Sequence, residues 1–234
     1  MHAFRFDDLA STGPGSFFCL DPKEEAHLFR ILRARPGETV ALLDGRGTVG
    51  TAVVEQDRRL KLESKRTVPP SARRLHLYFA PPKKQKLDIL LKQAVELGVH
   101  ELVPFLCERS VVQPGESSVA GRWMDLLFEA CKQSGNPFLP SVAAPMPFAA
   151  ALARARETCG VLITGSNRTG VFPELGTASD AAFFVGPEGG FTDAETDAMF
   201  AAGAIPLRIG DWTLRVETAA AAGLGVLNVL MNRP

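Results

Sequence analysis

Two patterns of hydrophobic and polar positions follow one another along the chain. Between residues 17 and 67, short β-branched and apolar runs are separated by tight turns, which predicts strands joined by hairpins. From residue 74 onward, short apolar runs alternate with longer segments in which apolar residues recur every three or four positions, the spacing of amphipathic helices. Strands that alternate with helices build a mainly parallel sheet covered on both faces. The sequence therefore predicts a small β-barrel domain over residues 1–70 and an α/β domain over residues 74–234.

The individual elements follow from these patterns. In the first domain we expect a short helix and two hairpin strands, at Glu24–Arg33, Thr39–Asp44 and Thr48–Val54. In the second domain we expect strands at Leu75–Ala80, Glu101–Leu106, Val161–Thr164, Ala182–Val185 and Ile205–Ile209. The expected helices are Lys84–Leu97, Arg122–Ser134, Asp193–Ala202 and roughly Glu217–Asn232. Two adjacent prolines in Val68–Ala72 indicate the linker, because proline fits neither a central strand nor a helix interior.

The overall charge balance hides an asymmetry. The 234 residues contain 26 Lys and Arg and 26 Asp and Glu, but residues 28–92 alone hold fifteen basic and six acidic residues, a net charge of +9. Such a block forms either a solvated face or a surface that neutralises phosphates. The chain has no apolar run of membrane-spanning length and no signal-peptide pattern, so we expect a cytoplasmic protein. The four cysteines are widely spaced and form no CxxC pair, so we expect no metal site.

One motif suggests a nucleotide and is better explained as a turn. Gly45-Arg-Gly-Thr-Val-Gly50 matches GxGxxG, the fingerprint of dinucleotide-binding folds. That fingerprint requires a helix to begin inside the motif, so that the helix N-terminus meets the pyrophosphate. Here the β-branched run Thr48–Val54 follows instead, which predicts a hairpin. A nicotinamide-dependent oxidoreductase would depend wholly on these glycines.

Two later segments share the order strand, glycine loop and helix. Phe183–Val185 leads into glycines at 186, 189 and 190, and the pair Thr192 and Glu195 then forms a capping box for the next helix. In the second segment, Leu207–Ile209 leads through Gly210 to Arg215 and an alanine-rich helix. Glycines at the carboxyl ends of parallel strands let a ligand approach the backbone. The two loops are therefore expected to form one pocket.

These two segments also carry a resemblance to a known family. Gly186-Pro-Glu-Gly-Gly190 with Leu214-Arg-Val-Glu-Thr-Ala219 resembles the signature of the bacterial ribosomal RNA small subunit methyltransferase E family, within the SPOUT superfamily of knotted methyltransferases. His27–Arg33 with Asp44-Gly45 is similar to the family's PUA-like barrel. Its middle motifs resemble Lys92–Val99, Glu108–Ser110 and Glu129–Gly135, whereas Trp212, Thr213 and Asn136 depart from its pattern. The order and spacing of the motifs make the likeness specific over nearly the whole chain.

The resemblance implies methylation of N3 of a uridine in 16S ribosomal RNA, with S-adenosylmethionine as the methyl donor. It also implies a trefoil knot that binds the cofactor in a bent shape, and an obligate homodimer with the pocket at its interface. The expected partners are 16S rRNA or the small ribosomal subunit and a second copy of the chain, with no membrane and no metal.

The implied catalytic residues are Arg215 and Glu188. A guanidinium donates hydrogen bonds in a fixed fork, so Arg215 is the candidate that stabilises the developing uracil anion; alternatively, it pairs with Glu217 or Glu188 only to hold the loop. Glu188 is either a general base or, as we favour, a brace that accepts backbone N–H bonds. Arg109 and Ser110 follow a strand and could reach the same pocket.

The remaining implied site residues fall into two groups. The cofactor would lie against Gly186, Pro187, Glu188, Gly189, Gly190, Ile209, Gly210, Leu214 and Thr218. Ribosomal RNA phosphates would contact Arg30, Arg33, Lys83, Lys84 and Lys86. Two alternatives keep the same fold: a SPOUT methyltransferase that acts on another RNA or another base atom, and a non-catalytic RNA-binding protein.

Overall fold

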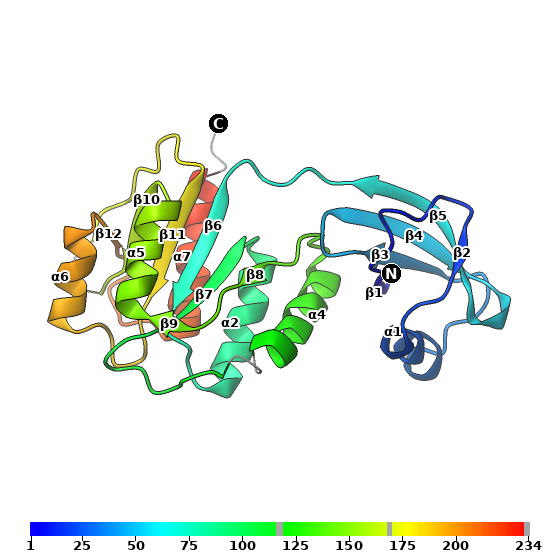
Figure 1. Cartoon of the computed structure of the whole chain (residues 1–234), viewed down its shortest axis with the longest axis horizontal. Helices are drawn as coiled ribbons and strands as arrows, with labels where there is room; N and C mark the ends of the chain where they lie inside the picture. The colour runs from blue at the N-terminus through cyan, green and yellow to red at the C-terminus, as the bar shows by residue number, and fades with distance from the viewer. Residues whose placement is uncertain (116–118, 168–169, 232–234) are drawn as a thin grey trace. The chain divides into compact units, whose positions relative to one another are not determined.

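The computed structural model describes residues 1–115, 119–167 and 170–231, and the chain divides into two compact units. The first unit comprises residues 1–70 and 128–139, and the second comprises residues 71–127 and 140–234. Figure 1 shows the helices and strands of each unit. Asn232, the expected end of the last helix, lies outside the described residues.

The first unit contains a five-stranded sheet. Its order is β1-β3-β4-β5-β2, and its neighbouring strands are antiparallel except for the pair β1 and β3. Alternate side chains of these strands face one apolar core, in which Phe4, Leu42 and Leu60 are buried. The strands are β1 (Ala3–Arg5), β2 (Phe17–Phe18), β3 (Thr39–Leu43), β4 (Thr48–Val54) and β5 (Leu60–Thr67).

The first unit confirms the hairpin interpretation of the GxGxxG match. Strands β3 and β4 are antiparallel neighbours, and the match lies in the turn between them and in β4 itself. Gly45 and Gly47 adopt φ angles of 71° and 104°, a backbone conformation that favours glycine. No helix begins there, so the oxidoreductase alternative loses its only motif.

The helix expected at Glu24–Arg33 begins and ends two residues earlier and is of two kinds. Helix α1 (Pro22–Ala26) begins after Asp21, whose carboxylate accepts the backbone N–H groups of Lys23 and Glu24. It continues as the π-helix η1 (His27–Ile31), so Arg33, with a φ of 57°, lies beyond its end. A 3-10 turn, η2 (Gln56–Arg58), precedes β5.

The second unit contains the expected parallel sheet. The described strands follow the order β12-β10-β11-β6-β7-β8, β9 pairs with β7, and every pair is parallel. All their carboxyl ends therefore lie at one edge of the sheet. The strands are β6 (Arg74–Phe79), β7 (Glu101–Leu106), β8 (Ser141–Val142), β9 (Met146–Pro147), β10 (Val161–Gly165), β11 (Asp180–Val185) and β12 (Ile205–Leu207).

Helices cover both faces of this sheet (Figure 1). Helices α2 (Lys84–Glu96) and α7 (Val216–Met231) pack together on one face, and α7 also contacts β11 and β6. On the other face, α5 (Phe148–Thr158) and α6 (Asp193–Ala201) contribute to an apolar cluster around Phe105 and Phe184. The helix expected at Arg122–Ser134 consists of a π-helix, η3 (Val119–Trp123), followed by α4 (Met124–Ser134).

Several parts of the second unit differ from the expected elements. The short strands β8 and β9 were not predicted. Helix α5 was not predicted, although its buried residues Phe148, Ala151, Leu152 and Ala155 have helical spacing. The strand expected to end at Ile209 ends at Leu207, so Ile209 belongs to the loop that follows.

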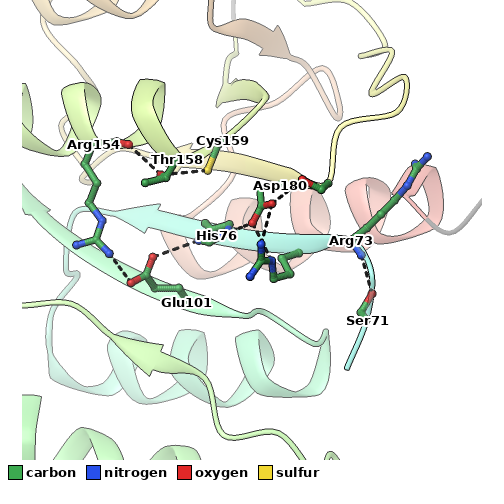
Figure 2. A network of polar contacts seen from close by, with 10 residues as sticks. Ser71, Arg73, His76, Glu101, Arg154, Thr158, Cys159 and Asp180 are labelled. Atoms are coloured by element: carbon green, nitrogen blue, oxygen red, sulfur yellow. Dashed lines mark hydrogen bonds and ion pairs between the residues drawn. The ribbon is translucent and has the colours of Figure 1, made fainter. Parts of the chain in front are cut away.

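Buried charges hold the amino ends of three strands together (Figure 2). His76 of β6 lies between two carboxylates: its Nδ1 is 3.2 Å from Glu101 of β7, and its Nε2 is 2.9 Å from Asp180 of β11. Arg154 of α5 donates to Glu101 at 2.6 Å, and Arg74 pairs with Asp180 at 2.9 Å. We call these five residues the amino-edge network.

The geometry of this network requires a charged imidazole. An ionised carboxylate only accepts hydrogen bonds, so both ring nitrogens of His76 must carry a proton. Burial works to lower the pKa of His76, but the hydrogen bonds to Glu101 and Asp180 outweigh it and raise that pKa. Hydrogen bonding by His76 lowers the pKa of Glu101 in turn. A cation therefore links β6, β7 and β11.

Candidate functional site

A cavity of about 510 Å³ opens at the carboxyl edge of the second unit's sheet. Three loops surround it: the end of β10, the glycine loop after β11 and the loop between β12 and α7. The cavity is of a size that holds a small molecule or cofactor. Ligands of parallel α/β sheets bind at this edge.

Most of the residues expected at the cofactor line this cavity. Thr218 does not, since it lies exposed on the first turns of α7. Arg215, the expected catalytic residue, also lines the cavity. The cofactor candidates in the lining are Gly186, Pro187, Glu188, Gly189, Gly190, Ile209, Gly210 and Leu214.

The glycine loop is shaped by close packing and by its helix cap. A β-carbon on Gly186 would lie 3.0 Å from the ring of Phe191, and Gly190 has a φ of 68°. Thr192 and Glu195 form the expected capping box at the start of α6, with hydrogen bonds of 3.2 and 2.9 Å. The backbone of this loop is thus held open toward the cavity.

Arg109 braces the loop from a different strand. Its guanidinium donates to the carbonyl of Gly189 at 3.0 Å and to that of Phe191 at 3.4 Å. The sequence left the reach of Arg109 open, because the contact joins residues 80 positions apart. Arg109 therefore performs the bracing that we expected of Glu188.

Glu188 has a different partner. Its carboxylate lies 3.4 Å from Nζ of Lys86 on α2, and about a third of each side chain is exposed. Within the described residues it accepts no backbone N–H bond, so the bracing interpretation of Glu188 is wrong. Lys86, which we expected to contact RNA phosphates, lines the cavity through this pair.

Arg215 lies on the cavity without an ion-pair partner. Its side chain makes no hydrogen bond or ion pair with the residues that the structure describes, so it pairs with neither Glu217 nor Glu188. Glu217 is buried, and its Oε2 atom has no partner in the described part of the chain. The exposed guanidinium of Arg215 is therefore free to meet a ligand.

The loop between β12 and α7 carries two of the three departures from the family pattern, Trp212 and Thr213. Thr213 accepts a hydrogen bond from the amide of Asn167 at 3.2 Å, which ties this loop to the loop after β10. Trp212 is 84% exposed and still lines the cavity. No sequence pattern indicated the contact between Asn167 and Thr213.

The remaining RNA candidates lie on the surface. Arg30 and Arg33 are exposed on the first unit, and Lys83 and Lys84 are exposed at the start of α2 in the second unit. The first turn of α2 contains no acidic residue. Lysines at a helix N-terminus are electrostatically unfavourable, because the helix dipole already places positive charge there. Such a cluster is typical of a site that meets an anion.

In the described ranges, no three His, Cys, Asp or Glu side chains are grouped as metal ligands. None of the helices described is both long enough and apolar enough to cross a membrane.

Models of protein families match both parts of the chain. A model described as an RNA methyltransferase domain matches residues 69–228. A second model, described as an RNA methyltransferase PUA domain, matches residues 20–64. The α/β fold with a parallel sheet and a PUA-like domain is thereby confirmed.

Individual relatives resemble the chain over its whole length. It is 30% identical to ribosomal RNA small subunit methyltransferase E of Mycobacterium bovis, over 98% of this chain and 92% of that protein. The protein of the same name from Synechocystis is 31% identical, over 88% and 70%. The crystal structure of ribosomal RNA small subunit methyltransferase E from Neisseria gonorrhoeae bound to S-adenosylmethionine has a TM-score of 0.84 and 26% identity, over 98% of both chains. The chain belongs to the ribosomal RNA small subunit methyltransferase E family.

Proposed function

We propose that the protein transfers the methyl group of S-adenosylmethionine to N3 of a specific uridine in 16S ribosomal RNA. The observation that carries this proposal is the cavity at the carboxyl edge, where two glycine loops and the unpaired Arg215 meet. The family's relatives are named for methylation of small-subunit ribosomal RNA.

The residues present fit S-adenosylmethionine. Glycines 189, 190 and 210 leave backbone groups accessible, and apolar side chains such as Phe183, Leu207 and Val216 offer surface for a neutral ring system. Charged side chains at the rim suit the amino-acid end of the molecule. When bound, this cofactor supplies an electrophilic methyl group on a sulfonium.

Arg215 is the residue that we assign to catalysis. The N3–H of uracil must lose its proton before the nitrogen can attack a methyl group, so negative charge develops on the base. A positioned guanidinium stabilises such charge without reorganising. In this role Arg215 is a hydrogen-bond donor and not the general base.

Lys86 and Glu188 form an ion pair at the same rim. We propose that Lys86 holds the Glu188 side chain toward α2, which leaves Arg215 as the charge that meets the uracil. Glu188 then has an electrostatic role at the cofactor rather than that of the general base.

The RNA is bound by phosphate contacts in this proposal. Lys83 and Lys84 are exposed at the N-terminus of α2 and make it basic. Arg30 and Arg33 are exposed on the PUA-like unit and add positive charge there. Neutralised phosphates release counterions, so affinity for RNA should fall steeply as salt increases. A flat salt response would contradict this part of the proposal.

Three finer features belong to the same proposal. The loops around the cavity thread a trefoil knot, residues 1–70 act as the RNA-binding domain, and residues 74–234 as the methyltransferase domain. The enzyme acts as a homodimer with the pocket at its interface, to which the exposed Trp212 and Leu214 offer apolar surface. Because its substrate is ribosomal RNA of the cell, it acts in the cytoplasm, on 16S rRNA or the small subunit.

Mass mapping of modified nucleosides tests the function in cells. Small-subunit rRNA from cells without the gene should lack a single 3-methyluridine, which the wild-type gene restores. An unchanged nucleoside profile would contradict the proposal. Binding of S-adenosylmethionine by the purified protein would then indicate another RNA substrate, and its absence would indicate a non-catalytic RNA-binding protein.

A further inference from the structure

One buried polar atom of the cavity has no partner among the residues that the structure describes. Thr164 lies at the carboxyl end of β10, lines the cavity and is only 2% exposed. Its Oγ1 makes no hydrogen bond within the described part of the chain. Among the described lining residues it is the only buried side-chain polar atom in this condition. Buried hydroxyl groups are normally hydrogen-bonded, so this one requires an explanation.

The unpartnered hydroxyl is unfavourable for the ligand-free protein. A buried donor or acceptor without a partner loses its hydrogen bonds to water and gains nothing in return. Valine has nearly the shape of threonine and would fill the same space without a polar atom. The fold alone therefore favours valine at position 164, and the hydroxyl is explained by something that enters the cavity.

The distribution of charge in the cavity indicates which part of a ligand reaches Thr164. The charged lining side chains lie at the exposed or half-exposed rim: Lys86, Arg109, Glu188, Asp193 and Arg215. The buried lining side chains are all neutral, and they include Thr164, Phe183, Val185, Leu207 and Val216. Burying a charge is costly, so the neutral part of a ligand belongs inside and its charged part at the rim.

We propose that the Thr164 hydroxyl hydrogen-bonds the adenosine part of S-adenosylmethionine. This inference rests on the proposed function, because it assumes that this cofactor occupies the cavity. The adenosine is the neutral part of the cofactor, whereas the sulfonium and the amino-acid group are charged. A hydroxyl both donates and accepts, so it can pair with either kind of polar atom on the nucleoside.

The test compares Thr164→Val with the wild type in two measurements on the purified protein. Without ligand, the variant should melt about 2–4 °C higher, because it removes an unsatisfied buried hydroxyl. It should also bind S-adenosylmethionine about fivefold to tenfold more weakly, because one hydrogen bond is lost. Thr164→Ser keeps the hydroxyl and should retain the affinity while its melting temperature falls.

A second ligand identifies the part of the cofactor involved. 5′-Methylthioadenosine keeps the adenosine and lacks the amino-acid end, so calorimetry with Thr164→Val should show the same fold loss for both ligands. A loss for S-adenosylmethionine alone would overturn the assignment to adenosine. Thr158→Val is the matched control, because the Thr158 hydroxyl already donates to the Arg154 carbonyl at 2.9 Å; it should change neither affinity.

The outcomes separate this inference from the proposed function. Unchanged affinities in Thr164→Val, with a wild type that binds both ligands, would overturn the role of Thr164 alone. A lower melting temperature of ligand-free Thr164→Val would show that the hydroxyl already has a partner and would also overturn it. A wild type that binds neither ligand would overturn the proposed function together with this inference.

Discussion

The two edges of the second unit's sheet use polar residues in opposite ways. At the amino edge, His76 is hydrogen-bonded to Glu101 and Asp180, and arginines pair with both carboxylates. At the carboxyl edge, Arg215 and the Thr164 hydroxyl have no partner among the described residues. The amino edge carries its charges on strands and a helix, whereas the carboxyl edge carries them mostly on glycine-rich loops.

This difference separates residues that maintain the fold from residues that await a ligand. His76 is hydrogen-bonded at both ring nitrogens, so its removal leaves two carboxylates without their shared partner and acts on stability. An exposed or unpaired polar group in a cavity does not stabilise the fold, so its removal weakens binding or turnover without lowering stability. Substitutions at the two edges should therefore affect different measurements.

Arg215→Ala should have the largest effect of all, and on turnover alone. Loss of one positioned donor for a developing anion lowers turnover by about 10²–10³-fold. The melting temperature should not change, since the Arg215 side chain has no partner in the described structure. Steady-state kinetics and thermal melts measure the two quantities. Near-normal turnover of Arg215→Lys would contradict a forked, bidentate role.

His76→Leu should destabilise the protein most, by about 3 kcal/mol, because it leaves two buried carboxylates without their shared cation. Urea unfolding measures the loss in free energy. His100 provides the matched control: its ring lies 5.5 Å from that of His76, but it is exposed. His100→Leu should change the free energy by less than about 0.5 kcal/mol. Equal effects of the two variants would contradict the importance of the network.

Gly223→Ala tests how the packing beneath the pocket supports it. A β-carbon at Gly223 would lie 2.2 Å from the ring of Phe183, which lines the cavity, so we expect a loss of about 2 kcal/mol and weaker cofactor binding. Gly225, two residues along α7, has no atom within 4 Å of such a carbon. Gly225→Ala should stabilise the helix by about 0.5–1 kcal/mol. Unfolding and calorimetry measure both variants, and stabilisation by both would contradict the close contact.

The amino edge should also set the dependence of stability on pH. The pKa of His76 is raised above its ordinary value of 6.5, so its contribution is complete below pH 6.5 and is lost as pH rises through the raised pKa. The pKa values of Glu101 and Asp180 are lowered, so their contribution is lost as pH falls below about 4. Unfolding free energies should therefore be highest between these limits, and His76→Leu should remove the alkaline decline. If the unfolding free energy of His76→Leu still falls at alkaline pH, the titration of His76 is not the cause of that fall.

Glu188→Gln should have the smallest effect. Its pair with Lys86 is partly exposed, so stability should change by less than about 0.5 kcal/mol. Turnover should fall by less than about tenfold, and the acid limb of the pH–rate profile should remain. If turnover instead falls by more than about 10²-fold and the acid limb of the pH–rate profile disappears, Glu188 is the general base.

The sequence predicts the elements of the fold better than their long-range contacts. Apolar runs identified five of the parallel strands, and glycines identified the two loops, because these signals are local. The network around His76 joins residues 25 and 104 positions apart, and only the register of the strands brings them together. Helix α5 was not predicted because it is short and alanine-rich, so the helical spacing of its apolar residues is a weak signal.

The residues of the pocket could be predicted from the sequence, but the contacts between its loops could not. The glycine loops and Arg215 follow from motifs, and the structure places them on one cavity. The brace by Arg109 and the bond between Asn167 and Thr213 depend on how separate loops meet, which no motif specifies. Thr164 is an ordinary residue of an apolar strand in the sequence, and only its burial without a partner marks it.

The most direct test of the account uses purified protein, S-adenosylmethionine with a deuterated methyl group, and small ribosomal subunits from cells without the gene. The account predicts one labelled nucleoside, 3-methyluridine, at a single position of 16S rRNA. Arg215→Ala should bind the cofactor and leave the RNA almost unlabelled. Label on another atom or another RNA, or full labelling by Arg215→Ala, would contradict it.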